Sequence, residues 1–138
     1  MLLNSPYITG SLTATGNTVI SGSLYAVGSN VVLPNQTYIR SYQNDSINIG
    51  TNVIGQIPTT DGNGVNIEYL IKSNTNYRTG NIMGVWDGSD VQFAEITTVD
   101  LGDTTPIVIT LDISSGNVRI LATASSTGWI VKVLAKIL

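Results

Sequence analysis

Two pairs of aspartates are the residues of this 138-residue sequence whose type and spacing could do chemistry. Asp87 and Asp90 flank one turn-like run, and Asp100 and Asp103 flank another. Paired carboxylates can serve as the acid and base of a glycosidase or as oxygen ligands for calcium. An aspartate in a turn more often accepts hydrogen bonds from its own backbone, and we favour that capping role for all four.

The amino-acid composition excludes most other kinds of catalytic and metal-binding site. The chain contains no cysteine and no histidine, which excludes Cys/His zinc sites, thiol nucleophiles and imidazole bases. The run 61–64, with the sequence Asp-Gly-Asn-Gly, lacks the further oxygen ligands of a calcium loop, and Glu68 and Glu95 have no matched partner. The sequence therefore predicts a protein that is not an enzyme and holds no metal and no cofactor.

The balance of charge restricts the partners. Six basic residues and a net charge of −3 do not provide the cationic surface that nucleic-acid binding needs. The first 39 residues carry no charge, but Ser, Thr, Asn and Gly interrupt them too often for a membrane-spanning helix, and no signal peptide is recognisable. We expect neither nucleic-acid binding nor membrane insertion.

Aromatic side chains in the second half are the remaining candidates for ligand contact. Trp86, Trp129, Tyr69 and Tyr77 could form a sugar-stacking surface, although in alternating strands such residues more often lie in the core or at a subunit interface. Arg78 is expected to make a structural hydrogen bond or ion pair, with another subunit as one option. Tyr77, Arg78 and Trp86 are thus candidates for contact with another subunit or a ligand.

The elements that must position these residues are predicted to be strands. From residue 61 onward apolar and polar residues alternate between turn-forming runs, and the chain is rich in Ile, Val and Thr. This pattern predicts an all-β protein with a C-terminal antiparallel β-sandwich, jelly-roll-like in type. Lys132 and Lys136 in the last segment fit a strand, which we favour, or an amphipathic helix. The predicted sandwich core includes Tyr69, Ile71, Ile107, Ile109, Val118 and Ile120.

An internal repeat opens the chain. Residues 8–17 align with residues 20–29 at an offset of 12, and six of the ten positions are identical. Two such units carry too little apolar surface to offset the cost of ordering them alone, so three intertwined chains would have to share their core. A flexible Gly/Ser linker is the alternative. The residues predicted to pack in a trimeric stalk are Ile8, Leu12, Ile20 and Leu24.

The repeat pattern I-[TS]-G-S-L-x-A-x-G resembles repeats in tail-fibre, baseplate and other virion structural proteins of tailed bacteriophages. The run 69–82 is similar to a Y-x-I-x-x-x-x-x-Y-R-x-G-x-I pattern in β-sandwich domains of phage fibre and decoration proteins, as is the G-x-x-R-I-L-x-T-x-S-S-T-G run at 116–128. The resemblance implies trimeric, intertwined β-structure and a place on a phage particle. It leaves open whether that place is the head or the tail.

Together these observations predict three parts: a repeat stalk over 1–33, a collar or linker over 34–60 and a sandwich head over 61–138. The predicted protein is a homotrimeric short fibre or a capsid-decoration (cement) protein on the outer surface of a virion, in contact with itself and with other capsid or tail proteins. The alternative hypothesis is a receptor-binding fibre tip that recognises a host surface glycan.

Overall fold

Two stacked β-sheets form the part of the chain that the structure describes. The structure is a computed structural model, and it describes residues 15–16, 19, 21 and 31–138. No α-helix occurs among these residues; two short 3-10 turns, η1 (Pro34–Gln36) and η2 (Thr59–Asp61), interrupt the strands. The strands are β1 (Val31–Leu33), β2 (Thr37–Ile47), β3 (Gly50–Pro58), β4 (Gly64–Ser73), β5 (Asn76–Trp86), β6 (Val91–Thr97), β7 (Ile107–Ser114), β8 (Asn117–Ala124) and β9 (Trp129–Ile137).

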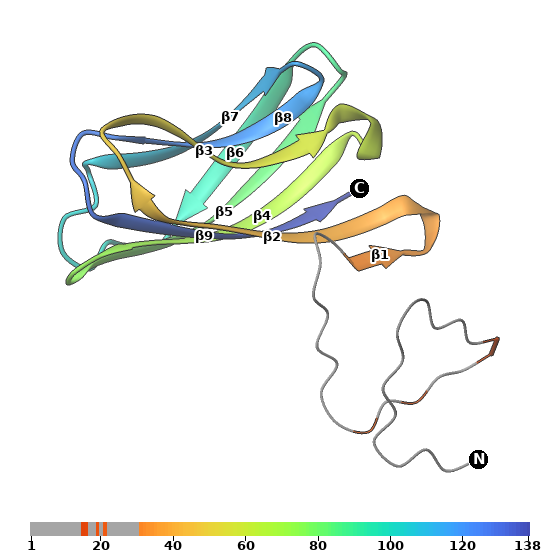
Figure 1. Cartoon of the computed structure of the whole chain (residues 1–138), viewed down its shortest axis with the longest axis horizontal. Coiled ribbons are helices and arrows are strands. Elements are labelled where there is room, and N and C mark those ends of the chain that lie inside the picture. Colours follow the sequence, from red (N-terminus) through yellow and green to blue (C-terminus); the bar gives the residue numbers. More distant parts are fainter. Residues whose placement is uncertain (1–14, 17–18, 20, 22–30) are drawn as a thin grey trace.

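The two sheets differ in size. The larger has six strands in the order β1-β2-β9-β4-β5-β6, and the smaller has three in the order β3-β8-β7. Every strand pair is antiparallel, and the layers lie face to face (Figure 1). The all-β antiparallel sandwich is therefore confirmed. The jelly-roll-like connectivity is not supported, because β4, β5 and β6 follow one another as hairpin neighbours within a single sheet.

The segment predicted as a collar belongs to the sandwich. In residues 34–60, β2 pairs with β9 and β3 pairs with β8, and Ile47, Ile54 and Ile57 are buried in the core. Both strands contain a register shift, one between Asn44 and Ile47 and one between Val53 and Gly55. A bulge breaks the period-two alternation of side chains. That break left the sequence pattern of this segment too irregular to place it in the sandwich.

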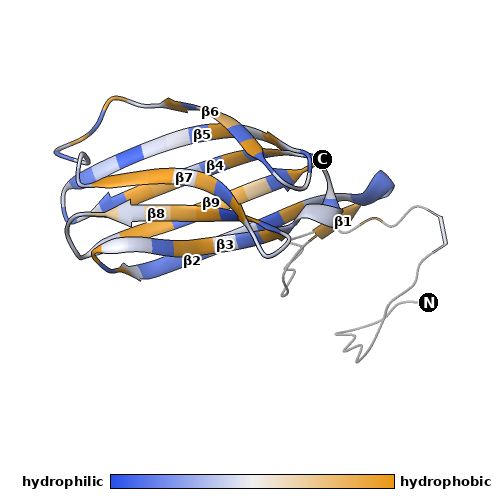
Figure 2. Cartoon of the chain, turned by 90° about the horizontal axis from the view of Figure 1, so that it is seen from above, coloured by the Kyte–Doolittle hydropathy of each residue, from blue (hydrophilic) through white to orange (hydrophobic). Residues whose placement is uncertain are grey.

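Side chains from both sheets meet in one apolar core. All six residues predicted for it are buried: Tyr69, Ile71, Ile107, Ile109, Val118 and Ile120. Alternation places apolar residues inward on each strand, because successive side chains of a strand point to opposite faces (Figure 2).

The last segment of the chain is a strand, which settles the choice between strand and helix. β9 lies in the six-stranded sheet between β2 and β4. Its residues alternate between buried positions and more exposed ones, and Lys132 and Lys136 are exposed on the outer face, away from the core. The Leu138 carbonyl accepts hydrogen bonds from the backbone N–H groups of Asn63 (2.8 Å) and Gly64 (3.0 Å), which fixes the end of the strand beside β4.

The predicted stalk falls almost wholly on residues that the structure does not describe. Ile8, Leu12, Ile20 and Leu24, proposed as stalk-packing residues, lie outside the described residues. Of the range 1–33, the described strand is β1, which pairs with β2 from Val31↔Ile39 to Leu33↔Thr37. Within the described residues, no helix has the length and apolar character needed to span a membrane.

Candidate functional site

The first aspartate pair stabilises its own turn. Asp87 Oδ1 accepts hydrogen bonds from the backbone N–H groups of Ser89 (3.0 Å) and Asp90 (3.0 Å) and from the Ser89 hydroxyl (2.9 Å). These donors, led by the Ser89 backbone N–H, lower the pKa of the Asp87 carboxyl. The Asp90 carboxylate accepts from the Val91 N–H (2.9 Å) and from Gln92 Nε2 (3.1 Å). Both carboxylates are therefore occupied by their own loop.

The second aspartate pair is occupied in the same way. Asp103 Oδ1 accepts from the Thr105 hydroxyl (2.6 Å) and the Thr105 N–H (3.0 Å), and these bonds lower the pKa of Asp103. Asp100 accepts a hydrogen bond from the hydroxyl of Thr104, a fully buried residue. The capping role favoured from the sequence describes these contacts.

Four of the other five carboxylates join different elements of the fold, and Asp45 accepts a hydrogen bond within its own strand. All nine acidic residues lie between residues 45 and 112, within the described chain, and each accepts at least one hydrogen bond from the chain itself. No group of three or more Asp or Glu side chains able to hold a metal occurs among the described residues. The remaining five contacts are Arg40–Asp61 (2.5 Å), Lys136–Glu68 (2.7 Å), Arg119–Asp112 (2.7 Å), Gln43–Asp45 (2.5 Å) and Tyr69–Glu95.

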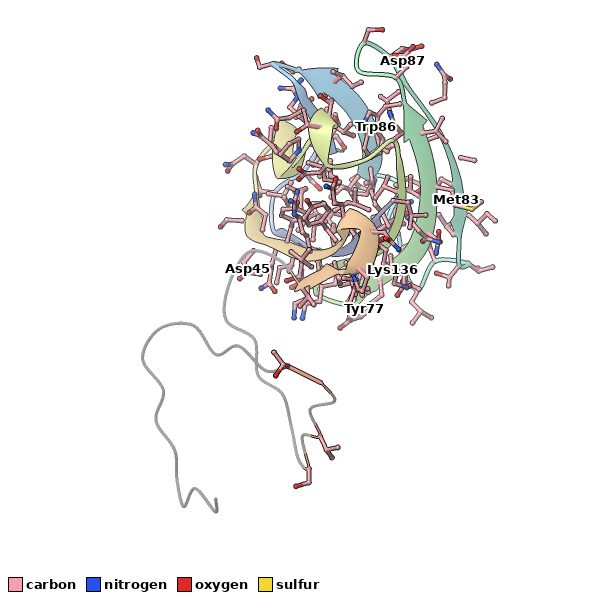
Figure 3. The ribbon with its side chains drawn as sticks, turned by 90° about the vertical axis from the view of Figure 1, so that its right-hand side faces the viewer. Asp45, Tyr77, Met83, Trp86, Asp87 and Lys136 are labelled. Atoms are coloured by element: carbon pink, nitrogen blue, oxygen red, sulfur yellow. The ribbon has the colours of Figure 1, made fainter. Side chains whose placement is uncertain are left out.

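The four aromatic residues considered for sugar stacking do not share a surface. Trp86, Trp129 and Tyr69 are buried in the core, whereas Tyr77 is 39% exposed. Tyr77 and Trp86 lie at opposite ends of β5 (Figure 3). The Trp86 indole N–H donates to the Thr59 carbonyl (3.3 Å), and that of Trp129 donates to the Ser126 hydroxyl (2.9 Å). The two tryptophans are core residues with satisfied polar groups.

Arg78 joins strands within one chain. Its Nη1 donates to the Thr104 hydroxyl (3.3 Å) and its Nη2 to the Ile107 carbonyl (3.0 Å), while Nε is buried without a partner. These bonds tie β5 to the loop before β7. Next to it, the backbone of Tyr77 exchanges two hydrogen bonds with Leu101, of 2.8 Å and 3.0 Å, which hold the same loop against β5.

A shallow hollow crosses the outer face of the six-stranded sheet, the face turned away from the core. We call it the outer-face hollow; its volume is about 570 Å³. Hydroxyl, amide and charged side chains line it together with Leu70 and Leu134, and Lys132 forms no ion pair within the described chain. The sequence pattern gave no sign of it, because its members come from four strands. The lining residues are Ser41, Tyr42, Gln43, Glu68, Tyr69, Leu70, Thr79, Lys132, Val133 and Leu134.

An exposed apolar surface lies at one margin of the same sheet. β6 is an edge strand, and its residues after Val91 are all exposed. Ile96 is 69% exposed, and Figure 3 shows Met83 on the outside of the sheet while Trp86 points inward. Exposed apolar side chains that gather along one edge of a sheet are typical of interaction sites. We call the group the edge patch; it consists of Met83, Val85 and Ile96 on the outer face, Phe93 on the inner face, and Val99 and Leu101 in the segment after β6.

In comparisons with known proteins, the chain is similar to solved structures in its fold alone. No protein-family model and no curated protein matches the chain. Solved structures that are similar include the tailspike protein gp49 of Acinetobacter baumannii bacteriophage Fri1, described as a capsular polysaccharide depolymerase. That match has a TM-score of 0.43 and 17% identity, and it covers 79% of this chain and 19% of the tailspike.

The tailspike protein of Acinetobacter phage vB_ApiP_P1 is also similar. Its match has a TM-score of 0.44 and 12% identity, and it covers 91% of this chain and 25% of the tailspike. The chain thus spans a quarter or less of the length of either tailspike. At these scores the likeness is confined to the β architecture.

Proposed function

We propose that the chain is a non-enzymatic structural protein of a bacteriophage particle, exposed on the outer surface of the virion and assembled as a homotrimer. It serves as a short fibre or as a capsid-decoration protein that contacts other virion proteins. The edge patch carries the proposal, because it gives the sandwich a surface suited to association with protein. The N-terminal repeat, with its resemblance to phage fibre repeats, supplies the link to a phage particle.

The non-enzymatic part of the proposal rests on how the carboxylates are used. The general acid of a glycosidase needs a raised pKa so that it holds its proton near neutral pH. Hydrogen bonds lower the pKa values of Asp87 and Asp103 instead, and the Arg119 guanidinium does the same for Asp112. Incubation with host-surface polysaccharide should release no new reducing ends. Release that disappears in Asp87→Asn or Asp90→Asn would identify a depolymerase.

The trimer is tested by mass in solution. Light scattering of the full chain at micromolar concentration should give three times 14.6 kDa. The double variant Leu12→Asp/Leu24→Asp should dissociate it, because it would bury unpaired charge at a shared apolar axis. Ser11→Asp/Ser23→Asp is the matched control: it adds the same charge at equivalent repeat positions that the pattern places outside. If both double variants stay trimeric, the repeat is a linker.

A receptor-binding role is the second candidate, and the outer-face hollow favours it. Hydroxyl and amide groups over an apolar floor suit the polar edges and apolar faces of a sugar, and Lys132 could pair with an acidic one. A glycan array probed with the full chain should then return ligands whose binding falls in Lys132→Ala. Binding should persist in Lys72→Ala, which removes a lysine from β4 that does not line the hollow.

A further inference from the structure

The edges of the two sheets are not equally protected. On β3, the Tyr42 hydroxyl donates to the Gln56 carbonyl (2.9 Å), the Tyr42 ring lies against Gly55, and the strand ends at Pro58. β7, the other edge of the three-stranded sheet, packs against β6. Natural proteins protect edge strands with bulges, prolines, lysines or covering segments, because an unpaired edge can bind another chain. The β3 edge follows this rule; β7 has no bulge, lysine or proline, but its inward residues Ile107, Ile109 and Leu111 are buried.

β6 shows none of these devices on its free side, and although it contacts β7, all its residues after Val91 are exposed. It pairs with β5 from Gly80↔Thr97 to Trp86↔Val91 without a register shift, and no described strand pairs with its other side. The strand has no lysine, arginine or proline. Its one charged side chain, Glu95, already accepts a hydrogen bond from the Tyr69 hydroxyl. This regularly paired edge of seven residues, whose single charge is Glu95, is therefore open to pairing.

β1 is a second open edge at the opposite margin of the same sheet. Its three residues, Val31, Val32 and Leu33, are all exposed and apolar, and its one described neighbour is β2. Within one chain, β1 and β6 are separated by five strand spacings, which is about 24 Å. Figure 2 shows β6 at one margin of the sandwich and β2, the neighbour of β1, at the other. The two open edges of one chain therefore cannot meet.

We propose that the β6 edge of one copy pairs with the β1 edge of the next, so that three copies close a ring; this rests on the proposed homotrimer. A second copy of this chain is the occupant because β1 carries no charge and β6 carries only Glu95, so pairing places no like charges opposite each other between copies of net charge −3. A trimeric N-terminal repeat would also deliver three β1 strands to one place, since β1 directly follows it. Pairing of unlike edges closes a ring when each step rotates by one third of a turn.

The absence of cysteine from the chain makes the proposal directly testable. Val31 pairs with Ile39 and lies on the outer face, and Ala94 pairs with Met83 on that same face. A disulfide needs Cα atoms within about 7 Å, so Val31→Cys and Ala94→Cys cannot bond within one chain. To cover alternative registers, Val31→Cys is also combined with Gln92→Cys and with Ile96→Cys, which share this face.

After oxidation of the full chain, at least one double variant should run as a covalent trimer on a denaturing gel, and each single variant should run as a monomer. Dimers of Ala94→Cys alone would mean pairing of β6 with β6, and a ladder beyond trimer would mean an open filament; either overturns the ring. If no double variant cross-links while light scattering gives a trimer, the edge pairing is wrong and the homotrimer stands. A monomeric wild type overturns both.

A charge placed on the edge gives an independent readout. Ile96→Lys adds an edge lysine at an exposed position of β6, whereas Val108→Lys adds one at an exposed, β-branched position of β7. We expect the first variant to lose the trimer at micromolar concentration and the second to keep it, with both chains folded by circular dichroism. Retention of the trimer by Ile96→Lys would contradict the proposal.

Discussion

β4 and β6 belong to the same sheet and have similar apolar content, yet their side chains meet different surroundings. β4 has β9 on one side and β5 on the other, and its inward residues Val65, Ile67, Tyr69 and Ile71 are all buried. β6 has one neighbour; its inward residue Phe93 is 39% exposed, and Ile96, on the outer face, is 69% exposed. β6 also contacts β7 of the smaller sheet, but that contact leaves its residues after Val91 exposed. For inward-facing side chains, the number of neighbouring strands, more than the apolar content of the strand, decides burial here.

Truncation of one isoleucine in each strand tests this comparison with the largest expected effect. Ile71→Ala in β4 should lower the free energy of unfolding by about 2–5 kcal/mol, because a fully buried side chain leaves a cavity. Ile96→Ala in β6 should change it by less than about 0.5 kcal/mol in the dissociated chain. Urea denaturation of both variants measures the two values. Equal costs would mean that β6 is as well packed as β4.

Gly80 of β5 leaves room for the Tyr69 side chain of β4 to pass over it and donate a hydrogen bond to Glu95 of β6. A Cβ at this position would lie 2.5 Å from the Tyr69 ring, which crosses the glycine on its way to Glu95. Gly80→Ala should therefore cost about 1–3 kcal/mol through overpacking. Gly64→Ala is the matched control in a neighbouring strand, because its Cβ would meet its nearest atom at 3.7 Å, an ordinary contact. If Gly64→Ala costs as much in urea denaturation, the glycine backbone rather than the ring contact is responsible.

Removal of one hydroxyl measures the link between the two strands. Tyr69→Phe keeps the buried ring but removes the donor to Glu95, at a cost of about 0.5–1.5 kcal/mol. Tyr77→Phe, at an exposed ring, should cost close to nothing. Burial, followed by the hydrogen bond to Glu95, raises the pKa of Tyr69. Burial also raises the pKa of Tyr42. An alkaline absorbance titration of Tyr77→Phe should therefore still contain two tyrosines that ionise late, and Tyr69→Phe should contain one.

Acid should lower the stability of the protein by protonating the carboxylates of Asp87 and Asp112. The Arg119 guanidinium, through its hydrogen bonds, lowers the pKa of Asp112, and backbone N–H groups lower that of Asp87. A carboxyl with a lowered pKa in the folded state contributes its full stability above its unfolded pKa of about 4, and the contribution is lost as the pH falls through the folded value. The melting temperature should therefore drop below about pH 4. In Asp112→Asn the drop should be smaller; an unchanged drop would assign it to the other carboxylates.

The predicted core shows how much of the fold was accessible from the pattern. Ile107, Ile109, Val118 and Ile120 alternate without interruption, and the structure buries all four. The bulges in β2 and β3 interrupt their alternation, so the sequence suggested a collar where the structure has two sandwich strands. The aspartate turns were predictable for the same reason as the core strands: each Asp accepts hydrogen bonds from residues one to four positions away.

The amino-acid sequence alone determined the chemistry that is excluded, the all-β class, the local turn contacts and the inward rows of the regular strands, because each depends on composition or on neighbours a few positions away. Tertiary structure alone decided the order of strands in the sheets, the burial of Trp86, the lining of the outer-face hollow and the open edge at β6. Residues such as Ser41, Glu68, Thr79 and Lys132 are far apart along the chain and become neighbours through strand pairing. A periodic pattern shows which side of a strand is apolar, but the adjacent strands and the opposite sheet determine whether that side is covered.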